Sequence, residues 1–178
     1  MYALVCHADT PANRVSAVRV ECTADDANEV LLTFVVEGCE ALVVPEWSSP
    51  ARTDELWRTT CFELFWQAAG GQAYLEVNLS PSGRWAAYAF DDYRAGMRDH
   101  AMDVDPHVEI MERGERFVVD ADVNSATFPD KASRIGLSAV IEETDGTKSY
   151  WALRHPPGAP DFHHPDCFAL ELPALARP

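Results

Sequence analysis

The segment from Leu56 to Met97 constrains the fold of this chain more than any other stretch. It holds three runs of strand length, at residues 61–67, 72–79 and 84–90, that are rich in aromatic and aliphatic side chains. Small and turn-forming residues separate the runs, which is typical of antiparallel strands joined by hairpin loops. The segment therefore predicts a three-stranded meander at the centre of the fold.

Two connections of four residues each set the expected register of this meander. With these lengths Glu63 lies opposite Glu76, and Asn78 lies opposite Trp85. Because side chains alternate along a strand, one face is expected to carry the core residues Phe62, Leu64, Trp66, Leu75, Val77, Leu79, Tyr88 and Phe90. The other face carries Cys61, Glu63, Phe65, Tyr74, Glu76, Asn78 and Trp85. Acids, an amide and aromatics on one sheet face indicate a binding surface.

The rest of the chain continues as short strands separated by loops. They are expected at residues 15–22, 30–36, 41–44, 108–112, 116–123, 135–142, 149–154 and 167–172. Asp145-Gly146 predicts a two-residue hairpin turn between two of them. About ten short strands with little helix predict an all-β fold, an antiparallel β-sandwich, and a length of 178 residues suits one domain over residues 1–178.

The composition of the chain limits the kinds of ligand and partner that it can bind. The chain has 29 acidic and 14 basic residues, a net charge of −15, which repels nucleic acid and anionic membranes and leaves neutral and cationic ligands. Its five cysteines are widely spaced without a C-x-x-C pair, so most are expected to be reduced core residues. The sequence shows neither a signal peptide nor an apolar run long enough to span a membrane, which predicts a cytoplasmic protein.

Several motifs resemble known binding domains. The run CFELFW followed by AYLEVNLSPSGRW is similar to family 9 carbohydrate-binding modules. The runs YLEVNLSPSGRWAAYAFDDYRAGM and SYWALRHPPGAPDFHHPDCFALEL resemble bacterial DOMON-like proteins related to those modules. The resemblance covers roughly residues 15 to 173. It implies a jelly-roll sandwich whose relatives bind sugars or haem without catalysing a reaction.

The resemblance also implies roles for individual residues. In the sugar-binding modules an aromatic side chain about six residues before a strand glutamate packs on the sugar ring, which matches Trp57 and Glu63. The glutamate binds sugar hydroxyls. An arginine and an asparagine two residues apart follow on the next strand, and those places hold Glu76 and Asn78 here. The family's arginine is therefore missing. A second aromatic from the C-terminal part completes the family's site.

The chemistry of sugars points to the same residues. A saccharide ring has apolar C–H faces and a rim of hydroxyls, so its site needs flat aromatic side chains and polar acceptors. The residues expected to supply them are Trp57, Glu63, Glu76, Asn78, Trp85 and Trp151, with Phe162 as the alternative to Trp151. The sequence thus predicts a non-catalytic module for a neutral saccharide, with no cofactor or metal.

Three other functions stay open. In a glycoside hydrolase, Glu63 and Glu76 would be the acid and the nucleophile, whose carboxyl groups lie roughly 5–5.5 Å apart in retaining enzymes. A haem-binding domain would take its axial ligands from Met97, Met102, Met111, His100 and His107. An interaction domain would bind no small ligand. A calcium site at Asp91, Asp92, Asp103 and Asp105 lacks the spacing of an EF-hand, and the sequence does not indicate an oligomeric state.

Overall fold

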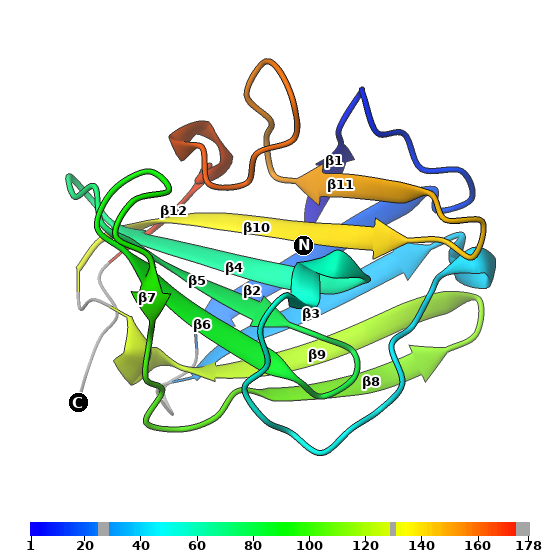
Figure 1. Cartoon of the computed structure of the whole chain (residues 1–178), viewed down its shortest axis with the longest axis horizontal. Coiled ribbons are helices and arrows are strands. Elements are labelled where there is room, and N and C mark those ends of the chain that lie inside the picture. The colour runs from blue at the N-terminus through cyan, green and yellow to red at the C-terminus, as the bar shows by residue number, and fades with distance from the viewer. Residues whose placement is uncertain (25–28, 129–130, 174–178) are drawn as a thin grey trace.

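The computed structural model of the protein describes residues 1–24, 29–128 and 131–173. These residues form twelve β-strands and four short 3-10 turns (Figure 1). The strand bounds are β1 Tyr2–Cys6, β2 Ala17–Ala24, β3 Glu29–Glu37, β4 Cys61–Ala68, β5 Tyr74–Leu79, β6 Trp85–Phe90, β7 Arg98–Asp99, β8 His107–Arg113, β9 Arg116–Asn124, β10 Ser133–Glu142, β11 Lys148–Ala152 and β12 Leu170–Leu172. No helix in the described part is long and apolar enough to cross a membrane. The all-β prediction is confirmed.

The strands form two antiparallel sheets that β1 joins. The first, here called the β4 sheet, has the order β7-β6-β5-β4-β10-β11, and β12 pairs with β10. The second, the β3 sheet, has the order β1-β2-β3-β9-β8. Because β1 pairs with both β11 and β2, the chain passes from one sheet to the other at this strand. In Figure 1, β2 and β3 run behind β4 and β10, which makes the molecule a curled sandwich.

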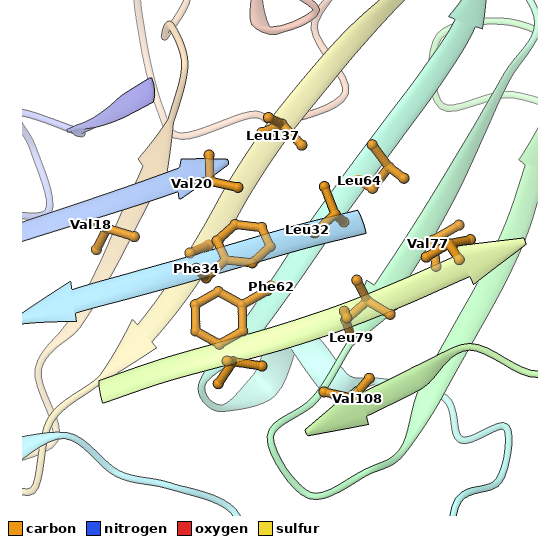
Figure 2. Packing of buried hydrophobic residues seen from close by; sticks show 14 of the residues in the cluster. Val18, Val20, Leu32, Phe34, Phe62, Leu64, Val77, Leu79, Val108 and Leu137 are labelled. Carbon is orange, nitrogen blue, oxygen red and sulfur yellow. The ribbon is translucent and has the colours of Figure 1, made fainter. Parts of the chain in front are cut away.

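The main core fills the space between the two sheets (Figure 2). Phe34 of the β3 sheet stacks on Phe62 of the β4 sheet, with ring centroids 4.5 Å apart. Leu64 and Val77 extend this contact along the β4 sheet and are fully buried. Alternation along each strand places such residues inward, and their burial from water is the main stabilising term for the fold.

The first hairpin of the meander differs from its predicted register by two residues. Gln67 pairs with Tyr74, so six residues connect the paired positions, where four were expected. Glu63 consequently lies opposite Asn78 and not opposite Glu76, whose partner is Phe65. A slip of two residues leaves every side chain on its original face. The predicted faces of β4 and β5 are therefore correct, although the pairing of the two acids is wrong.

The second hairpin differs by one residue, which reverses the faces of β6. Leu79 pairs with Trp85, so five residues connect them, and the Ser80 N–H donates to the Arg84 carbonyl at 2.9 Å. Trp85 therefore points into the main core and is 5% exposed. Tyr88 and Phe90 belong to the apolar cluster on the opposite face of the β4 sheet. The predicted placement of these three residues is wrong.

Other segments correct the strand list. β1 was not expected, and residues 41–44 form no strand: a 3-10 turn at Cys39–Ala41 leads into a single bridge between Leu42 and Glu143. The hairpin at Asp145-Gly146 exists, but Glu142 pairs with Lys148 and the Glu143 N–H bonds the Thr147 carbonyl, so its loop has three residues. The connection between the strands expected at 15–22 and 30–36 lies mostly outside the described residues. All five cysteines are free thiols.

Candidate functional site

A cavity of about 360 Å³ opens on the outer face of the β4 sheet, away from the main core. Strands β4, β5, β6, β10 and β11 form its floor, and the loops at 91–97 and 156–168 contribute its rim. Its lining residues are Trp57, Glu63, Glu76, Phe90, Arg94, Met97, Val140, Tyr150, Pro160, Phe162 and His163. The size is at the lower end for small-molecule sites, which suits a small ligand.

Two buried acids form the polar part of the floor. Glu63 on β4 is 3% exposed, and Glu76 on β5 is 5% exposed. The Ser138 hydroxyl donates to Glu63 Oε2 at 3.0 Å, and Asn78 Nδ2 donates to Glu76 Oε1 at 2.8 Å. Glu63 pairs with Asn78, and Glu76 lies two residues before Asn78 on β5. Because side chains alternate along a strand, all three point to the same face of the sheet. The neighbouring side chains hold both carboxyl groups in place.

The burial of these acids changes their protonation. Burial raises the pKa of both carboxyl groups above the ordinary glutamate range, because a charged carboxylate is poorly solvated there. The charge of Glu76 raises the pKa of Glu63 further, while the Ser138 hydrogen bond opposes the shift. The pair therefore keeps a proton at higher pH than two exposed glutamates would.

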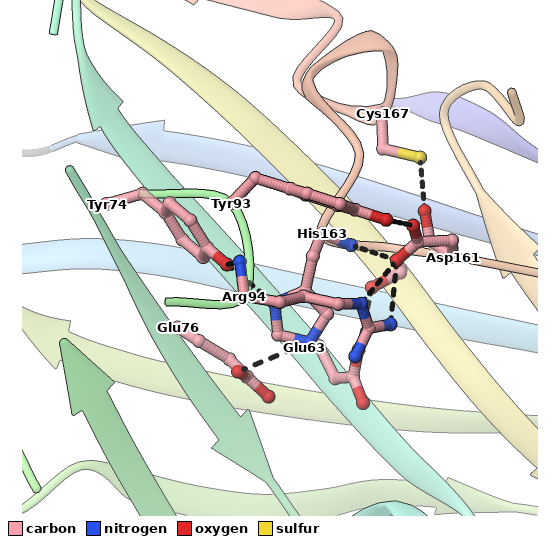
Figure 3. A network of polar contacts seen from close by, with 9 residues as sticks. Glu63, Tyr74, Glu76, Tyr93, Arg94, Asp161, His163 and Cys167 are labelled. Atoms are coloured by element: carbon pink, nitrogen blue, oxygen red, sulfur yellow. Dashed lines mark hydrogen bonds and ion pairs between the residues drawn. The ribbon is translucent and has the colours of Figure 1, made fainter. Parts of the chain in front are cut away.

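A histidine from the C-terminal loop reaches the same floor (Figure 3). Tyr74 OH accepts from the Arg94 N–H at 3.2 Å and lies 2.8 Å from His163 Nδ1. The Tyr74 hydroxyl and His163 Nδ1 thus share one hydrogen bond, and His163 Nε2 lies 3.8 Å from Glu76 Oε2. Burial lowers the pKa of His163 to about 4, so the ring is neutral near pH 7.

Arg94 is held over the cavity by an acid from another loop. Its Nε and Nη2 donate to Asp161 Oδ1 at 3.2 and 2.7 Å. Asp161 also accepts from the Tyr93 hydroxyl and from the His163 N–H, so it connects the loop at 91–97 to the C-terminal loop. These contacts place a guanidinium group, with five potential donors, at the rim.

Aromatic side chains form the walls. Trp57 is 38% exposed and meets Tyr88 edge-on, with ring centroids 6.3 Å apart. Phe90, Tyr150 and Phe162 line the remaining sides, together with Met97 and Pro160. Such a lining offers flat apolar surface beside the polar floor, which is the combination that a sugar ring requires.

Backbone strain gathers at the segments that deliver these side chains. Among the described residues, only Glu55 and Arg94 adopt a positive φ without being glycine, at 63° and 51°. Glu55 precedes the 3-10 turn Leu56–Arg58, which carries Trp57. Non-glycine residues in the left-handed region are uncommon and tend to occur at functional sites. Their position on both sides of the cavity is an independent indication that it is used.

The structure brings together only part of the predicted site. Trp57, Glu63 and Glu76 line the cavity. Asn78 is fully buried and lies behind the cavity wall, where it orients Glu76. Of the two C-terminal aromatic candidates, Phe162 lines the cavity.

Trp85 and Trp151 do not belong to the cavity. Both are 5% exposed and lie in the main core between the sheets. Trp151 pairs with Ala139, which also pairs with Phe62, so Trp151 shares the inner face with Phe62. Its neighbour Tyr150 points outward and lines the cavity in its place. Neither tryptophan therefore contributes to the lining of this cavity, although both were expected to bind the ligand.

Arg94, His163, Phe90 and Tyr150 were not predicted as site residues. Phe90 and Tyr150 follow from strand alternation once the register is known. Arg94 and His163 lie in loops, where no periodic pattern marks their direction. An arginine thus reaches the cavity from a loop and not from a strand.

Residues considered for haem or calcium are dispersed. Of the methionines and histidines weighed as axial ligands, only Met97 lines the cavity. Asp91 pairs with Arg98 at 2.7 Å, and Asp92 accepts from the Tyr93 N–H. The described residues contain no group of three or more histidine, cysteine or acidic side chains placed to hold a metal ion.

The raised pKa of the acid pair predicts how stability depends on pH. Between the unfolded value of about 4.3 and the higher folded value, the native state binds more protons than the unfolded state, so stability falls as pH rises. Glu63→Gln is expected to flatten this decline, measured as urea midpoints from pH 5 to 8.

His163 gives the opposite slope, because its lowered pKa costs stability as pH falls below about 6.5. That slope is present in both proteins, so their difference isolates the acid pair. Identical slopes would contradict the raised pKa.

Comparisons with known proteins support the fold. No protein-family profile matches the chain, and no curated protein matches its sequence. A candidate carbohydrate-binding protein from Bacteroides uniformis superposes with a TM-score of 0.68 at 16% identity, covering 93% of this chain and 82% of that chain. A family 9 carbohydrate-binding module from Caldicellulosiruptor kristjanssonii in complex with glucose gives a TM-score of 0.46 at 13% identity, covering 84% of this chain and 72% of that chain. The first of these likenesses establishes a shared sandwich fold.

Proposed function

We propose that this protein is a non-catalytic carbohydrate-binding module and that the cavity on the β4 sheet holds a saccharide ring. The observation that carries the proposal is the convergence of Trp57, Glu63 and Glu76, from three separate elements, in one open cavity. The Bacteroides uniformis protein of the same fold is itself described as a candidate carbohydrate-binding protein, which agrees with this function. We also propose that the protein is related to the DOMON-like proteins that its sequence motifs resemble.

Each part of a sugar ring has a partner in the cavity. The apolar C–H face can stack on Trp57, whose exposed part faces the opening. Hydroxyl groups at the rim of the ring can donate to Glu63 and Glu76 and accept from Arg94. The carboxyl groups are fixed by Ser138 and Asn78 before any ligand arrives, which lowers the entropy cost of binding. This arrangement recognises a sugar without requiring a chemical step.

Trp57→Ala is expected to weaken saccharide binding about tenfold, which corresponds to roughly 1.4 kcal/mol of lost stacking and burial. Glu63→Gln keeps the shape of the side chain but is also expected to weaken binding, because it replaces an oxygen that can accept from a sugar hydroxyl with an NH2 group that can only donate. Isothermal titration calorimetry against a panel of mono- and oligosaccharides measures both effects, and the sugars should be recovered unchanged.

Trp47→Ala is the matched control, because Trp47 is 70% exposed and does not line the cavity. It should bind as wild type does. If no sugar binds the wild type at millimolar concentration, or if Trp57→Ala binds as well as wild type, the assignment of this cavity to saccharides is wrong.

A further inference from the structure

The charges around the cavity do not balance. Arg94 is the one cationic side chain that lines it in the described structure, and its guanidinium is already paired with Asp161. Asp161 is buried enough for this pair to be well formed, since its side chain is 17% exposed. The positive charge of Arg94 is therefore offset before the acids of the floor are considered, so Glu63 and Glu76 leave a negative excess.

His163 does not supply the missing charge. Its Nδ1 lies 2.8 Å from the Tyr74 hydroxyl, and its Nε2 lies 3.8 Å from Glu76 Oε2. Arg94 lies nearby and, together with burial, lowers the pKa of the imidazole to about 4. The ring is therefore neutral near pH 7. Its place beside Glu76 and Tyr74 is drawn in Figure 3.

Glu63 in particular has unused hydrogen-bonding capacity. Its Oε2 accepts from Ser138, but no donor among the described residues reaches its Oε1. The residue is only 3% exposed and yet lines the cavity, so this oxygen is available to a donor that enters the cavity. Glu76 Oε2 has only the long contact to His163. Each carboxyl group therefore offers one oxygen to a ligand.

Building on the proposed function, we propose that the saccharide is an amino sugar, and that its protonated amine lies between Glu63 and Glu76 while its ring stacks on Trp57. A primary ammonium is compact and has three donors, which matches two carboxyl groups that each present an oxygen. In a buried site the attraction between opposite charges is much stronger than in water. The net charge of −15 adds a long-range attraction for cations.

The donor set favours an amine over a metal ion. Calcium takes six to eight oxygen ligands, and magnesium demands octahedral coordination. The floor offers two carboxyl groups beside aromatic walls, and no third acid, cysteine or suitably placed histidine completes a metal site in the described chain. An organic cation with apolar ring faces uses both parts of the cavity.

Binding of an ammonium group is coupled to proton release. The free pair holds a proton because both acids are buried and close to one another. The ammonium stabilises both carboxylates, so the proton leaves when the ligand binds. The other titratable groups facing the pair are Cys61, Tyr74, Tyr88, Arg94, Tyr150 and His163. Burial raises the pKa of Cys61, Tyr74 and Tyr88, so these groups stay neutral near pH 7 and do not take up the proton.

The test compares three sugars that differ at one position: glucose, glucosamine and N-acetylglucosamine. Calorimetry at pH 7 is expected to show glucosamine binding at least about tenfold more tightly than the two neutral sugars, the advantage of a charge-assisted contact. Titrations in two buffers with different heats of ionisation should show a proton released by glucosamine and none by glucose. In Glu63→Gln the ratio of glucosamine to glucose affinity should fall toward one.

Glu109→Gln is the control for net charge, because this exposed acid lies on β8 of the other sheet. It should keep the preference for glucosamine. Equal affinities for glucose and glucosamine, or a preference that survives in Glu63→Gln, would overturn the amino-sugar inference and leave the proposed function standing. Failure of all three sugars to bind at millimolar concentration would instead overturn the proposed function itself.

Discussion

Replacing Glu143 with alanine is expected to lower the free energy of unfolding by about 3 kcal/mol, because three backbone N–H groups, one of them buried, lose the carboxylate that accepts from them. Glu143 is 1% exposed and accepts hydrogen bonds from the backbone N–H groups of Asn13, Arg14 and Val15, at 2.7, 2.5 and 3.1 Å. One carboxyl group thus fixes the segment that leads from β1 into β2. Since β1 joins the two sheets, loosening this segment weakens the connection between them.

Two variants test this role by urea denaturation. Glu143→Gln keeps one acceptor oxygen and should lose less stability than Glu143→Ala. Glu142→Gln is the matched control, because the adjacent Glu142 makes only a partly exposed ion pair with Lys148 at 3.9 Å. Such pairs contribute about 0–1 kcal/mol. If Glu142→Gln and Glu143→Ala lose the same amount, the three backbone contacts do not explain the effect.

The sequence predicted the face of each side chain in the meander correctly wherever the expected loop length was wrong by an even number of residues. An expected loop of four residues in place of six shifted β5 by two positions, so Glu63 and Glu76 kept their face and only their pairing was wrong. An expected loop of four residues in place of five shifted β6 by one position, which exchanged Trp85 with Tyr88 and Phe90. Loop length is therefore the weak step when faces are inferred from a sequence.

The sequence contained a signal for the correct length of that second loop. Gly83 adopts a φ of 84°. Within the five residues that connect Leu79 to Trp85, the Ser80 N–H bonds the Arg84 carbonyl, and Gly83 is the last of the three residues between them. Three-residue hairpin loops characteristically place glycine in this left-handed conformation at their last position. Gly146 has the same role in the hairpin between β10 and β11, with a φ of 87°. Reading glycine as the third loop residue would have corrected both hairpins.

The candidate site divides into a predictable and an unpredictable half. Glu63 and Glu76 lie on strands, where the alternation of side chains along the sequence is enough to indicate their direction. Arg94 and His163 lie in loops that meet through Asp161, 67 residues from Arg94 in the sequence. Such a contact depends on tertiary packing, which leaves no local pattern. The charge balance of the cavity, and the inference about its ligand, could therefore come only from the three-dimensional arrangement of these loops.

Burying the two acids has a cost that the scaffold must offset. Carboxyl groups without full hydrogen bonding are unfavourable in a protein interior, and apolar residues of similar size would be more stable at positions 63 and 76. The neighbours of Glu63 along β4 are apolar and buried on both faces of the sheet. A stability cost at the centre of a strand that is buried over seven of its eight residues supports a functional reason for the acids.

Trp66→Ala is expected to lower the free energy of unfolding by about 3–5 kcal/mol, because it opens a large cavity in the main core. Trp66 is 1% exposed and stacks on Phe128, with ring centroids 4.2 Å apart and planes 13° from parallel. Its neighbour Phe65 points to the opposite face, toward the candidate site. Urea denaturation measures the loss, and Trp57→Ala is the comparison, since the half-exposed Trp57 should contribute little to stability. Sugar binding should respond in the opposite way, falling in Trp57→Ala and persisting in folded Trp66→Ala. A Trp66→Ala protein as stable as wild type would show that the sandwich core does not depend on this residue.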